Sequence, residues 1–260
     1  MIQNVLRGAD PEMFLVEKDT KKLVTSIGRI GGTKQDPRPI LNGEGFAVQE
    51  DNVAVEFNIP PAPSKQTFID SLSQAIAYIA DEVSQQGLEL LINPTATFDF
   101  MDLLHPQALE LGCEPDYNAW TLKVNPRPVA PETLRSSGGH LHIGYDNPDK
   151  DTSIQLIRAH DIFCGIASLT YDDDVTRRSI YGNAGAHRIK KYGVEYRTLS
   201  NAWLRSEKLM AFIYEQSEKA VEFVNKGGEI GDEWASMIID TINNGKTNNI
   251  AALDKHFAIL

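Results

Sequence analysis

The residues best suited to chemistry in this sequence are acidic, imidazole and guanidinium side chains that recur in pairs on short strand-like segments. Residues 135–145 read RSSGGHLHIGY. A strand there places His140 and His142 on one face and aliphatic side chains on the other. Two imidazoles on a buried strand cost stability unless other groups pair with them. The two glycines before His140 allow another strand or a ligand to approach the backbone closely.

Three other segments repeat this alternation of polar and apolar residues. Their polar members are Asp10 and Glu12, Glu56 and Asn58, and Glu195 and Arg197. Carboxylates that converge in one cleft repel one another unless cations neutralise them or their pKa values rise. Oxygen-rich sites suit Mg²⁺, and an added imidazole makes Mn²⁺ acceptable too. The pattern therefore predicts a divalent-metal site that strands from distant parts of the chain build together.

Arginines near these carboxylates make the predicted chemistry of the acidic site more specific. Arg197 shares a face with Glu195, and Arg178 and Arg188 lie just upstream. Guanidinium beside metal and carboxylate is an arrangement that holds a triphosphate and neutralises charge at its γ-phosphoryl group. The sequence contains neither a Walker-type loop nor a Rossmann glycine motif. A nucleotide would therefore have to bind on the face of an antiparallel sheet.

Composition excludes several classes of protein. The 260 residues are 42% hydrophobic and 23% charged, which is typical of a soluble globular protein and argues against a disordered or fibrous one. The net charge of −11 argues against binding to duplex nucleic acid. Cys113 and Cys164 lack metal or disulfide spacing, and there is no signal peptide or apolar run of eighteen residues. We expect a reduced, cytoplasmic setting without membrane insertion.

The elements that position these residues are expected in one domain, residues 1–260, because the polar strands are spread from residue 10 to residue 197 with no dividing linker. Strands are predicted at 5–16, 23–27, 46–48, 52–59, 88–92, 96–98, 140–145 and 193–199. Helices are predicted from a Ser64 cap to Gly87 and at 152–171, 206–226, 232–244 and 249–257. Segments 28–45 and 177–188 are predicted loops that close over the site.

Four motifs in order carry a resemblance to a known family. They are GADPE at 8–12, VEFN at 55–58, GGHLHIG at 138–144 and GVEYR at 193–197. This set resembles the carboxylate–amine ligases of the glutamine synthetase/glutamate–cysteine ligase superfamily, and more narrowly the phage-encoded type 2 COOH–NH₂ amidoligases. The resemblance covers about residues 5–205, whereas the C-terminal helices at 206–260 carry no matching motif. It implies an α+β fold in which a curved, mainly antiparallel sheet forms a funnel-shaped site with helices packed outside.

The resemblance also implies roles for individual residues. It implies ATP with two or three Mg²⁺ or Mn²⁺ ions, one held by Glu12 and Glu56 and another by Asp10, His140 and Glu195. The residues implied to act in catalysis are Glu56, His140, Glu195 and Arg197. Arg197 would hold the phosphates, and His142 and Arg188 are further expected nucleotide contacts. The expected substrate contacts are Arg135, Arg178 and Asn58.

The reaction implied by the resemblance is ATP-dependent amide formation. The γ-phosphoryl group moves to a substrate carboxylate, an amine attacks the acyl phosphate, and phosphate leaves. The amine or carboxylate belongs to a small molecule, a peptide or a modified nucleotide, and a phage-encoded enzyme would act in the host cytoplasm.

Three alternatives remain open for the same site: a phosphotransferase, a metallohydrolase that uses His140 and His142, and a non-catalytic phage structural or binding protein. Only the ligase makes ADP release depend on an amine. Hydrolytic zinc sites usually contain more His or Cys ligands than this sequence offers, which argues against the metallohydrolase.

Overall fold

Antiparallel strand pairing organises this α+β protein. The computed structural model describes residues 1–109, 115–126 and 129–260, and the pairs between their named strands are all antiparallel. The first sheet has the order β1 (Leu6–Ala9), β11 (Leu141–Gly144), β13 (Gly193–Tyr196), β12 (Ala186–Lys190) and β9 (Tyr117–Asn118). The second has the order β3 (Leu23–Val24), β2 (Glu12–Glu17), β6 (Ala54–Asn58), β5 (Ala47–Asp51) and β4 (Arg38–Pro39), with β7 (Leu88–Leu91) also paired to β2. A third, smaller sheet pairs β8 (Thr95–Thr97) with β10 (Leu134–Ser136).

The two larger sheets meet where the chain passes from β1 to β2. The prediction of one strand over 5–16 was wrong, because Pro11 divides it and cannot donate a main-chain hydrogen bond. Pro11 still accepts one, at 3.2 Å from the Phe57 amide, and the Ile59 amide donates to Ala9 at 3.2 Å. On the other side, the Glu12 amide donates to the Gly138 carbonyl at 2.9 Å. These bonds join the sheets into one curved surface, with Asp10 and Glu12 at the bend.

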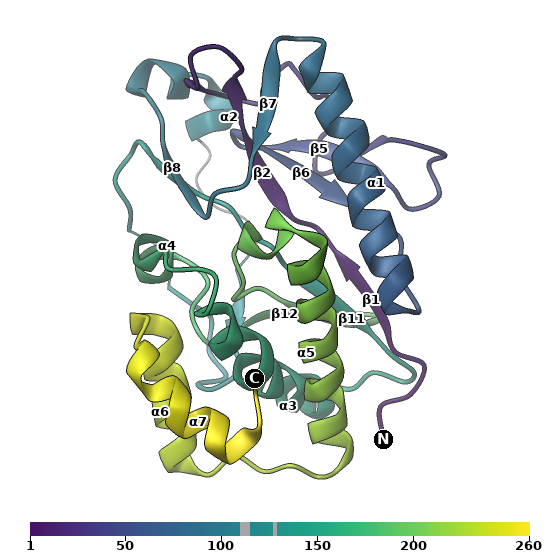
Figure 1. Ribbon diagram of the computed structural model, residues 1–260, viewed down its shortest axis with the longest axis vertical. Coiled ribbons are helices and arrows are strands. Elements are labelled where there is room, and N and C mark those ends of the chain that lie inside the picture. The colour runs from purple at the N-terminus through teal and green to yellow at the C-terminus, as the bar shows by residue number, and fades with distance from the viewer. Residues whose placement is uncertain (110–114, 127–128) are drawn as a thin grey trace.

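Helices cover the outside of this surface (Figure 1). The longer ones are α1 (Lys65–Ser84), α3 (Lys150–His160), α5 (Glu207–Asn225), α6 (Asp232–Asn244) and α7 (Ile250–Phe257), and the shorter ones are α2 (Pro106–Leu109) and α4 (Val175–Ile180). Short 3₁₀ segments lie at 100–103, 201–205 and 247–249. α1 packs against β7 and α5, and α3 packs against β12 and β13. The predicted cap of α1 is confirmed, because Ser64 accepts a hydrogen bond from the Thr67 amide.

Two predicted segments differ from the structure. The predicted helix 152–171 is α3 followed by a π-helical segment at Asp161–Ile166, and helical structure ends at residue 168. The predicted loop 177–188 is largely regular structure, because Asp174 caps α4 and the chain then enters β12. Only the short connection between α4 and β12 remains a loop.

The core lies between the helices and the strands. One hydrophobic cluster joins α1, α5 and both larger sheets, with Phe68, Leu72, Met13, Val55 and Tyr196 fully buried in it. A core shared in this way supports the interpretation of residues 1–260 as one domain, which stays a prediction. Cys164 is a buried free thiol, and Cys113 lies outside the described residues.

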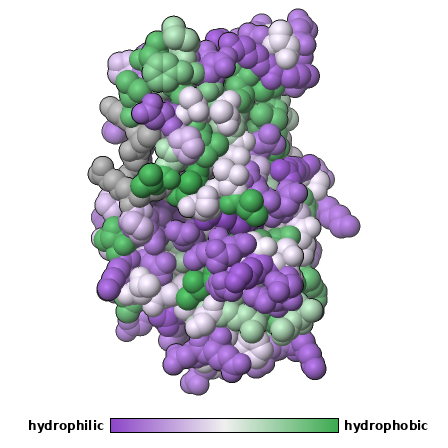
Figure 2. All heavy atoms as spheres, turned by 90° about the vertical axis from the view of Figure 1, so that its left-hand side faces the viewer, coloured by the Kyte–Doolittle hydropathy of each residue, from purple (hydrophilic) through white to green (hydrophobic). Residues whose placement is uncertain are grey.

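The surface mixes polar and apolar residues (Figure 2). Exposed apolar side chains gather in the segment 100–109, which includes Phe100, Met101 and Leu109. Among the described residues, no helix has the length and apolar character needed to cross a membrane.

Candidate active site

Each site-bearing strand turns its apolar side chains toward the core and its polar side chains toward the bend between the sheets. Leu141, Ile143, Val194, Tyr196, Val55 and Phe57 belong to the main core. Their neighbours in the alternation are therefore on the opposite face. These neighbours are His140, His142, Glu195, Arg197, Glu56 and Asn58. The sequence-predicted alternation is confirmed on these strands.

The histidine strand reaches the bend because two glycines precede it. A Cβ atom on Gly139 would lie 2.3 Å from the Ser200 carbonyl oxygen, and one on Gly138 would lie 2.3 Å from Nε2 of His140. The close backbone approach predicted at this pair is therefore present at Gly139, whereas Gly138 leaves room for the His140 ring. His140 and His142 converge on Oδ1 of Asp10, with His140 Nδ1 at 3.3 Å and His142 Nε2 at 3.1 Å.

A first group of potential metal ligands combines Asp10, His140 and Glu195. One donor atom from each lies within 4.8 Å of the others. Asp10 lies in the β1–β2 bend, His140 directly precedes β11, and Glu195 lies within β13. His140 and Glu195 are only 2% and 1% exposed. Two carboxylates and one imidazole in this space match the donor preference of Mn²⁺ or Mg²⁺.

A second group combines Glu12, Asp51 and Glu56, again with donor atoms within 4.8 Å of one another. Glu12 lies opposite Glu56 in the β2–β6 register, and Asp51 ends β5. Sequence reasoning did not select Asp51. The signal that would have found it is the β5–β6 hairpin register, because Asp51 pairs with Ala54 and therefore lies diagonally to Glu56 on one face. Three carboxylates form an oxygen-only donor set of the kind that binds Mg²⁺.

Three negative charges close together in the second group are energetically unfavourable. Burial, followed by repulsion from Asp51, raises the pKa of Glu12 to about 7. Burial and repulsion from Asp10, Asp51 and Glu12 raise the pKa of Glu56 well above its ordinary value. Protons or cations must therefore relieve this cluster. The donor set and its charge both fit a divalent cation held by Glu12, Asp51 and Glu56.

The first group carries its charge more easily because imidazoles and cations surround it. Burial and Asp10 act to raise the pKa of Glu195, but Arg197 and the two histidines lower it to about 2. Burial would also raise the pKa of Asp10, yet His142 and His140 bring it well below its ordinary value. Both carboxylates are therefore ionised at neutral pH and available as ligands.

Cations line one side of the first group. Arg197 donates to Glu195 through Nη1 and to the Tyr181 hydroxyl through Nη2. Lys190 Nζ lies 2.7 Å from Glu195 Oε2, and Arg188 Nη1 lies 3.6 Å from Glu195 Oε1. Sequence reasoning selected Arg197 and Arg188, but it did not select Lys190. Lys190 follows Arg188 by two residues on β12, so strand alternation would have placed both on one face.

Two further residues, Asp116 and His142, lie beside the first group of ligands. Oδ2 of Asp116, which the sequence motifs do not include, lies 3.9 Å from Nε of Arg197. His142 is hydrogen-bonded through Nδ1 to the Tyr192 hydroxyl. Burial would lower the pKa of His142, but attraction to Asp10 and Glu195 raises it overall.

Two predicted substrate contacts, Arg135 and Arg178, make intramolecular contacts in the structure. The buried Arg135 guanidinium donates to Asn52 Oδ1 and to the carbonyl oxygens of Ala108, Glu132 and Leu134. The buried Arg178 guanidinium lies 3.1 Å from Asp172 Oδ2 and 3.2 Å from Ser168 Oγ. These contacts stabilise the fold around both guanidinium groups, and the substrate role of Arg135 and Arg178 stays a prediction.

The third predicted substrate contact, Asn58, lies near the site. It is half-buried at the end of β6, on the face of Glu56 and opposite Ala47. Its side chain is therefore placed beside the second group of carboxylates, and its substrate role stays a prediction.

Comparisons with known proteins agree with the motifs. A family model described as "Phage phiEco32-like COOH.NH2 ligase-type 2" matches residues 130–228, the segment that contains His140, Glu195 and Arg197. No curated protein sequence matches this chain. One of the similar solved structures is the cryo-electron microscopy structure of Plasmodium falciparum glutamine synthetase, with 11% identity and a TM-score of 0.47. The match covers 85% of this chain and 52% of that one, so this chain spans about half the length of that protein. The family match confirms the predicted recognition: over residues 130–228, this chain is similar to the phage-type carboxylate–amine ligases.

Proposed function

We propose that this protein is an ATP-dependent carboxylate–amine ligase that forms an amide bond through an acyl phosphate. The observation that carries the proposal is the convergence of two groups of metal ligands beside Arg197, from segments as distant as residue 10 and residue 195. The family match over residues 130–228 supports the same reaction class.

The two groups have complementary tasks in this proposal. Glu12, Asp51 and Glu56 would hold one divalent cation, and Asp10, His140 and Glu195 another. Bound Mg²⁺ or Mn²⁺ supplies Lewis-acid stabilisation of the phosphoryl oxygens and orients the two reacting partners. Asn201 helps to hold the main chain at Glu12 in place, because its side-chain Nδ2 donates to the main-chain carbonyl of Glu12 at 2.8 Å.

The cationic side of the site would bind the nucleotide's phosphates. Arg197 has a fixed orientation because Glu195 and Tyr181 hold its two terminal nitrogens. Arg188 and Lys190 reach the same edge from β12. Positive groups fixed before the reaction stabilise charge that develops during phosphoryl transfer without reorganising. His142 lies at the rim of this region and is the further nucleotide contact that we propose.

The chemistry then needs no nucleophile from the protein. A substrate carboxylate oxygen attacks the γ-phosphorus, and ADP leaves. The amine nitrogen next attacks the acyl carbon, the bond from that carbon to the phosphate oxygen breaks, and the nitrogen loses a proton. The side chains of this chain bind, orient and neutralise charge in both steps.

The first experiment measures ADP release with Mg²⁺ or Mn²⁺ across a panel of amines paired with carboxylic acids. We expect release in the wild type to depend on both an amine and a carboxylate. Glu195→Gln removes one ligand charge and the negative charge that pairs with Arg197, so its rate should fall by on the order of 10²-fold or more. Glu215→Gln is the matched control, because Glu215 is half-exposed on α5, where it pairs with Lys65 at 2.6 Å.

Two outcomes would contradict the proposal. Equal rates of ADP release by the wild type and Glu195→Gln would show that Glu195 is not part of the active site. ADP release that needs a carboxylate but is the same with and without every amine would favour a phosphotransferase.

A further inference from the structure

A second charged site lies on the opposite face of β1. Gly8 faces the active-site side, since a Cβ atom there would lie 3.5 Å from that of His142. Arg7 precedes Gly8 and therefore projects to the other face. There it packs against α5, and only 5% of its surface is exposed.

The Arg7 guanidinium has unusually few partners for a buried cation. Its Nε donates to Ser217 Oγ at 2.9 Å, and its central carbon lies 4.6 Å from the centre of the Tyr214 ring. Among the described residues, no carboxylate oxygen lies within 4.0 Å of it, and its two terminal nitrogens make no hydrogen bond. A buried positive charge without a counter-ion is costly, and this one has donors left for an anion.

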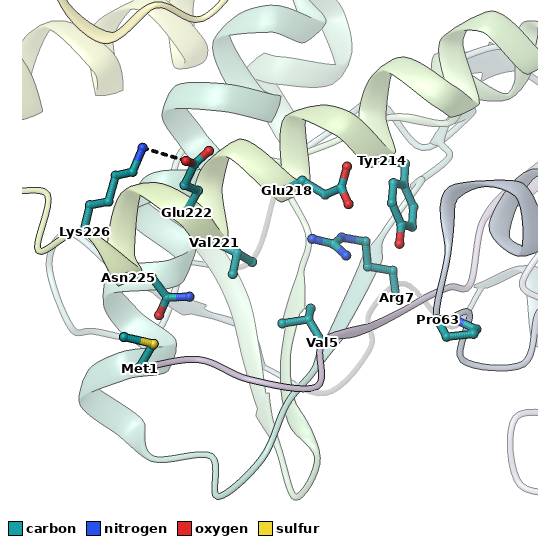
Figure 3. Close-up of a pocket in the computed structure, with 10 residues that line it drawn as sticks. All are labelled: Met1, Val5, Arg7, Pro63, Tyr214, Glu218, Val221, Glu222, Asn225 and Lys226. Atoms are coloured by element: carbon teal, nitrogen blue, oxygen red, sulfur yellow. Dashed lines mark ion pairs between the residues drawn. The ribbon is translucent and has the colours of Figure 1, made fainter.

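These free donors face a pocket of about 550 Å³. Figure 3 shows the Arg7 guanidinium pointing into the space bounded by Glu218, Val221 and Val5. Pro63 and the Tyr214 ring add apolar wall, and the exposed Lys226–Glu222 ion pair, 2.6 Å apart, lies at the far end. The volume falls in the range that holds small organic ligands.

We propose that this pocket binds a small monocarboxylic acid with an apolar body. The carboxylate would accept hydrogen bonds from the terminal nitrogens of Arg7, in the forked geometry that guanidinium favours. The apolar body would lie against Val5 and Val221. Glu218 and Glu222 on the wall repel negative charge, so a monoanion is preferred to a dianion such as hydrogen phosphate. This site is separate from the proposed ligase reaction and does not depend on it.

The experiment titrates the full chain with butyrate, with the isosteric neutral butyramide and with inorganic phosphate, and follows amide chemical shifts in nuclear magnetic resonance spectra. We expect saturable shifts for residues on α5 with butyrate, and weaker binding of butyramide and phosphate. Arg7→Met keeps the side-chain volume and removes the charge, so it should weaken butyrate binding by about 10-fold or more. Lys65→Met, which removes an exposed cation at the start of α1, should leave it unchanged.

A second variant keeps the test decisive if Arg7→Met does not fold. Glu218→Gln removes a competing negative charge, so butyrate should bind more tightly to it than to the wild type. Equal butyrate affinity in Glu218→Gln and wild type, butyramide binding as tight as butyrate, or tighter binding of phosphate would each overturn the proposal. Absence of any saturable response up to about 50 mM butyrate, far above typical ligand affinities, would do the same.

Discussion

At the scale of single residues, the clustered carboxylates of the second group (Glu12, Asp51 and Glu56) oppose the stability of the metal-free protein. The pKa of Glu56 is raised well above its ordinary value by burial and by three neighbouring acids. The pKa of Glu195, in contrast, is lowered to about 2 because cations and imidazoles outweigh its burial. Strongly shifted pKa values of neighbouring groups are common at functional sites.

This conflict predicts opposite effects of one substitution on stability and on metal binding. Glu56→Gln removes a buried charge that Glu12 and Asp51 repel, so we expect a higher melting temperature than the wild type without metal. Millimolar Mg²⁺ should stabilise the wild type, by about 2.7 kcal/mol at a concentration 100 times the dissociation constant, and should stabilise Glu56→Gln far less. Thermal unfolding with EDTA and with Mg²⁺ measures both effects.

Glu215→Gln again provides the control, and its response to Mg²⁺ should equal that of the wild type. If Mg²⁺ raises the melting temperature of Glu56→Gln as much as that of the wild type, Glu56 is not a metal ligand.

At the scale of elements, the bend between the sheets depends on a close approach between three segments. The Gly139 amide donates to the Leu199 carbonyl at 3.0 Å, and Trp203 Nε1 donates to the Gly139 carbonyl at 3.1 Å. A Cβ atom on Gly139 would lie 2.3 Å from the Ser200 carbonyl oxygen. The start of the histidine strand therefore has no room for a side chain, and its position beside β13 sets the distance from His140 to Glu195.

We therefore expect Gly139→Ala to be costly. It should destabilise the protein by about 1–3 kcal/mol or more, because backbone must move to accommodate the methyl group. Gly231→Ala is the matched control, since no atom lies within 4 Å of an added Cβ there and φ is −66°. Its cost should stay below about 1 kcal/mol, because the change there is only the weaker preference of alanine for the N-cap position of α6. Urea unfolding compares the two, and equal stability of both variants would contradict the packing argument.

At the scale of the whole molecule, one buried carboxylate ties three separate elements together behind the site. Asp161 begins the π-helical turn after α3 and accepts hydrogen bonds from Trp120 Nε1 at 2.6 Å, from the Tyr196 hydroxyl at 2.8 Å and from Thr198 Oγ1 at 3.3 Å. Trp120 anchors the segment that carries Asp116 toward Arg197. Burial outweighs these hydrogen bonds and raises the pKa of Asp161 to about 7.

This raised pKa predicts that Asp161 makes folding depend on pH. In the unfolded chain the group ionises near its ordinary pKa of 3.8, whereas in the folded protein it ionises near pH 7. Its contribution to stability is therefore fully present below pH 4 and is lost as the pH rises to 7, by on the order of 4 kcal/mol. Asp161→Asn stays neutral, so the variant should lose less stability than the wild type between pH 5 and pH 8.

Urea unfolding of both proteins at the two pH values gives this difference directly. The neighbouring His160 acts in the opposite direction, because burial lowers its pKa to about 4 and its contribution is lost as the pH falls below 6.5. That contribution is common to both proteins and cancels in the comparison. Equal pH dependence of wild type and Asp161→Asn would show that Asp161 does not titrate in this way.

The sequence by itself determined the local features of this protein. The alternation of Leu141, Ile143, Val194 and Tyr196 with polar residues identified strand faces, because a strand's side chains alternate strictly. Ser64 marked the start of α1 through its cap. The residue types at 10, 12, 56, 140 and 195 indicated a shared cation site because buried carboxylates need a partner. The same residues supplied the motifs of the family resemblance.

Only the tertiary structure decided which charged groups meet. Asp51 joins Glu12 and Glu56, and Lys190 joins Glu195, through strand registers that local patterns do not fix. Arg135, Arg178 and Arg197 look the same in sequence, yet Arg135 donates to the Ala108 carbonyl, Arg178 pairs with Asp172, and Arg197 alone of the three pairs with Glu195. The physical reason is that strand and helix periodicity sets the face on which a side chain lies. The bend at Pro11 and the pairing of distant strands determine what that face meets.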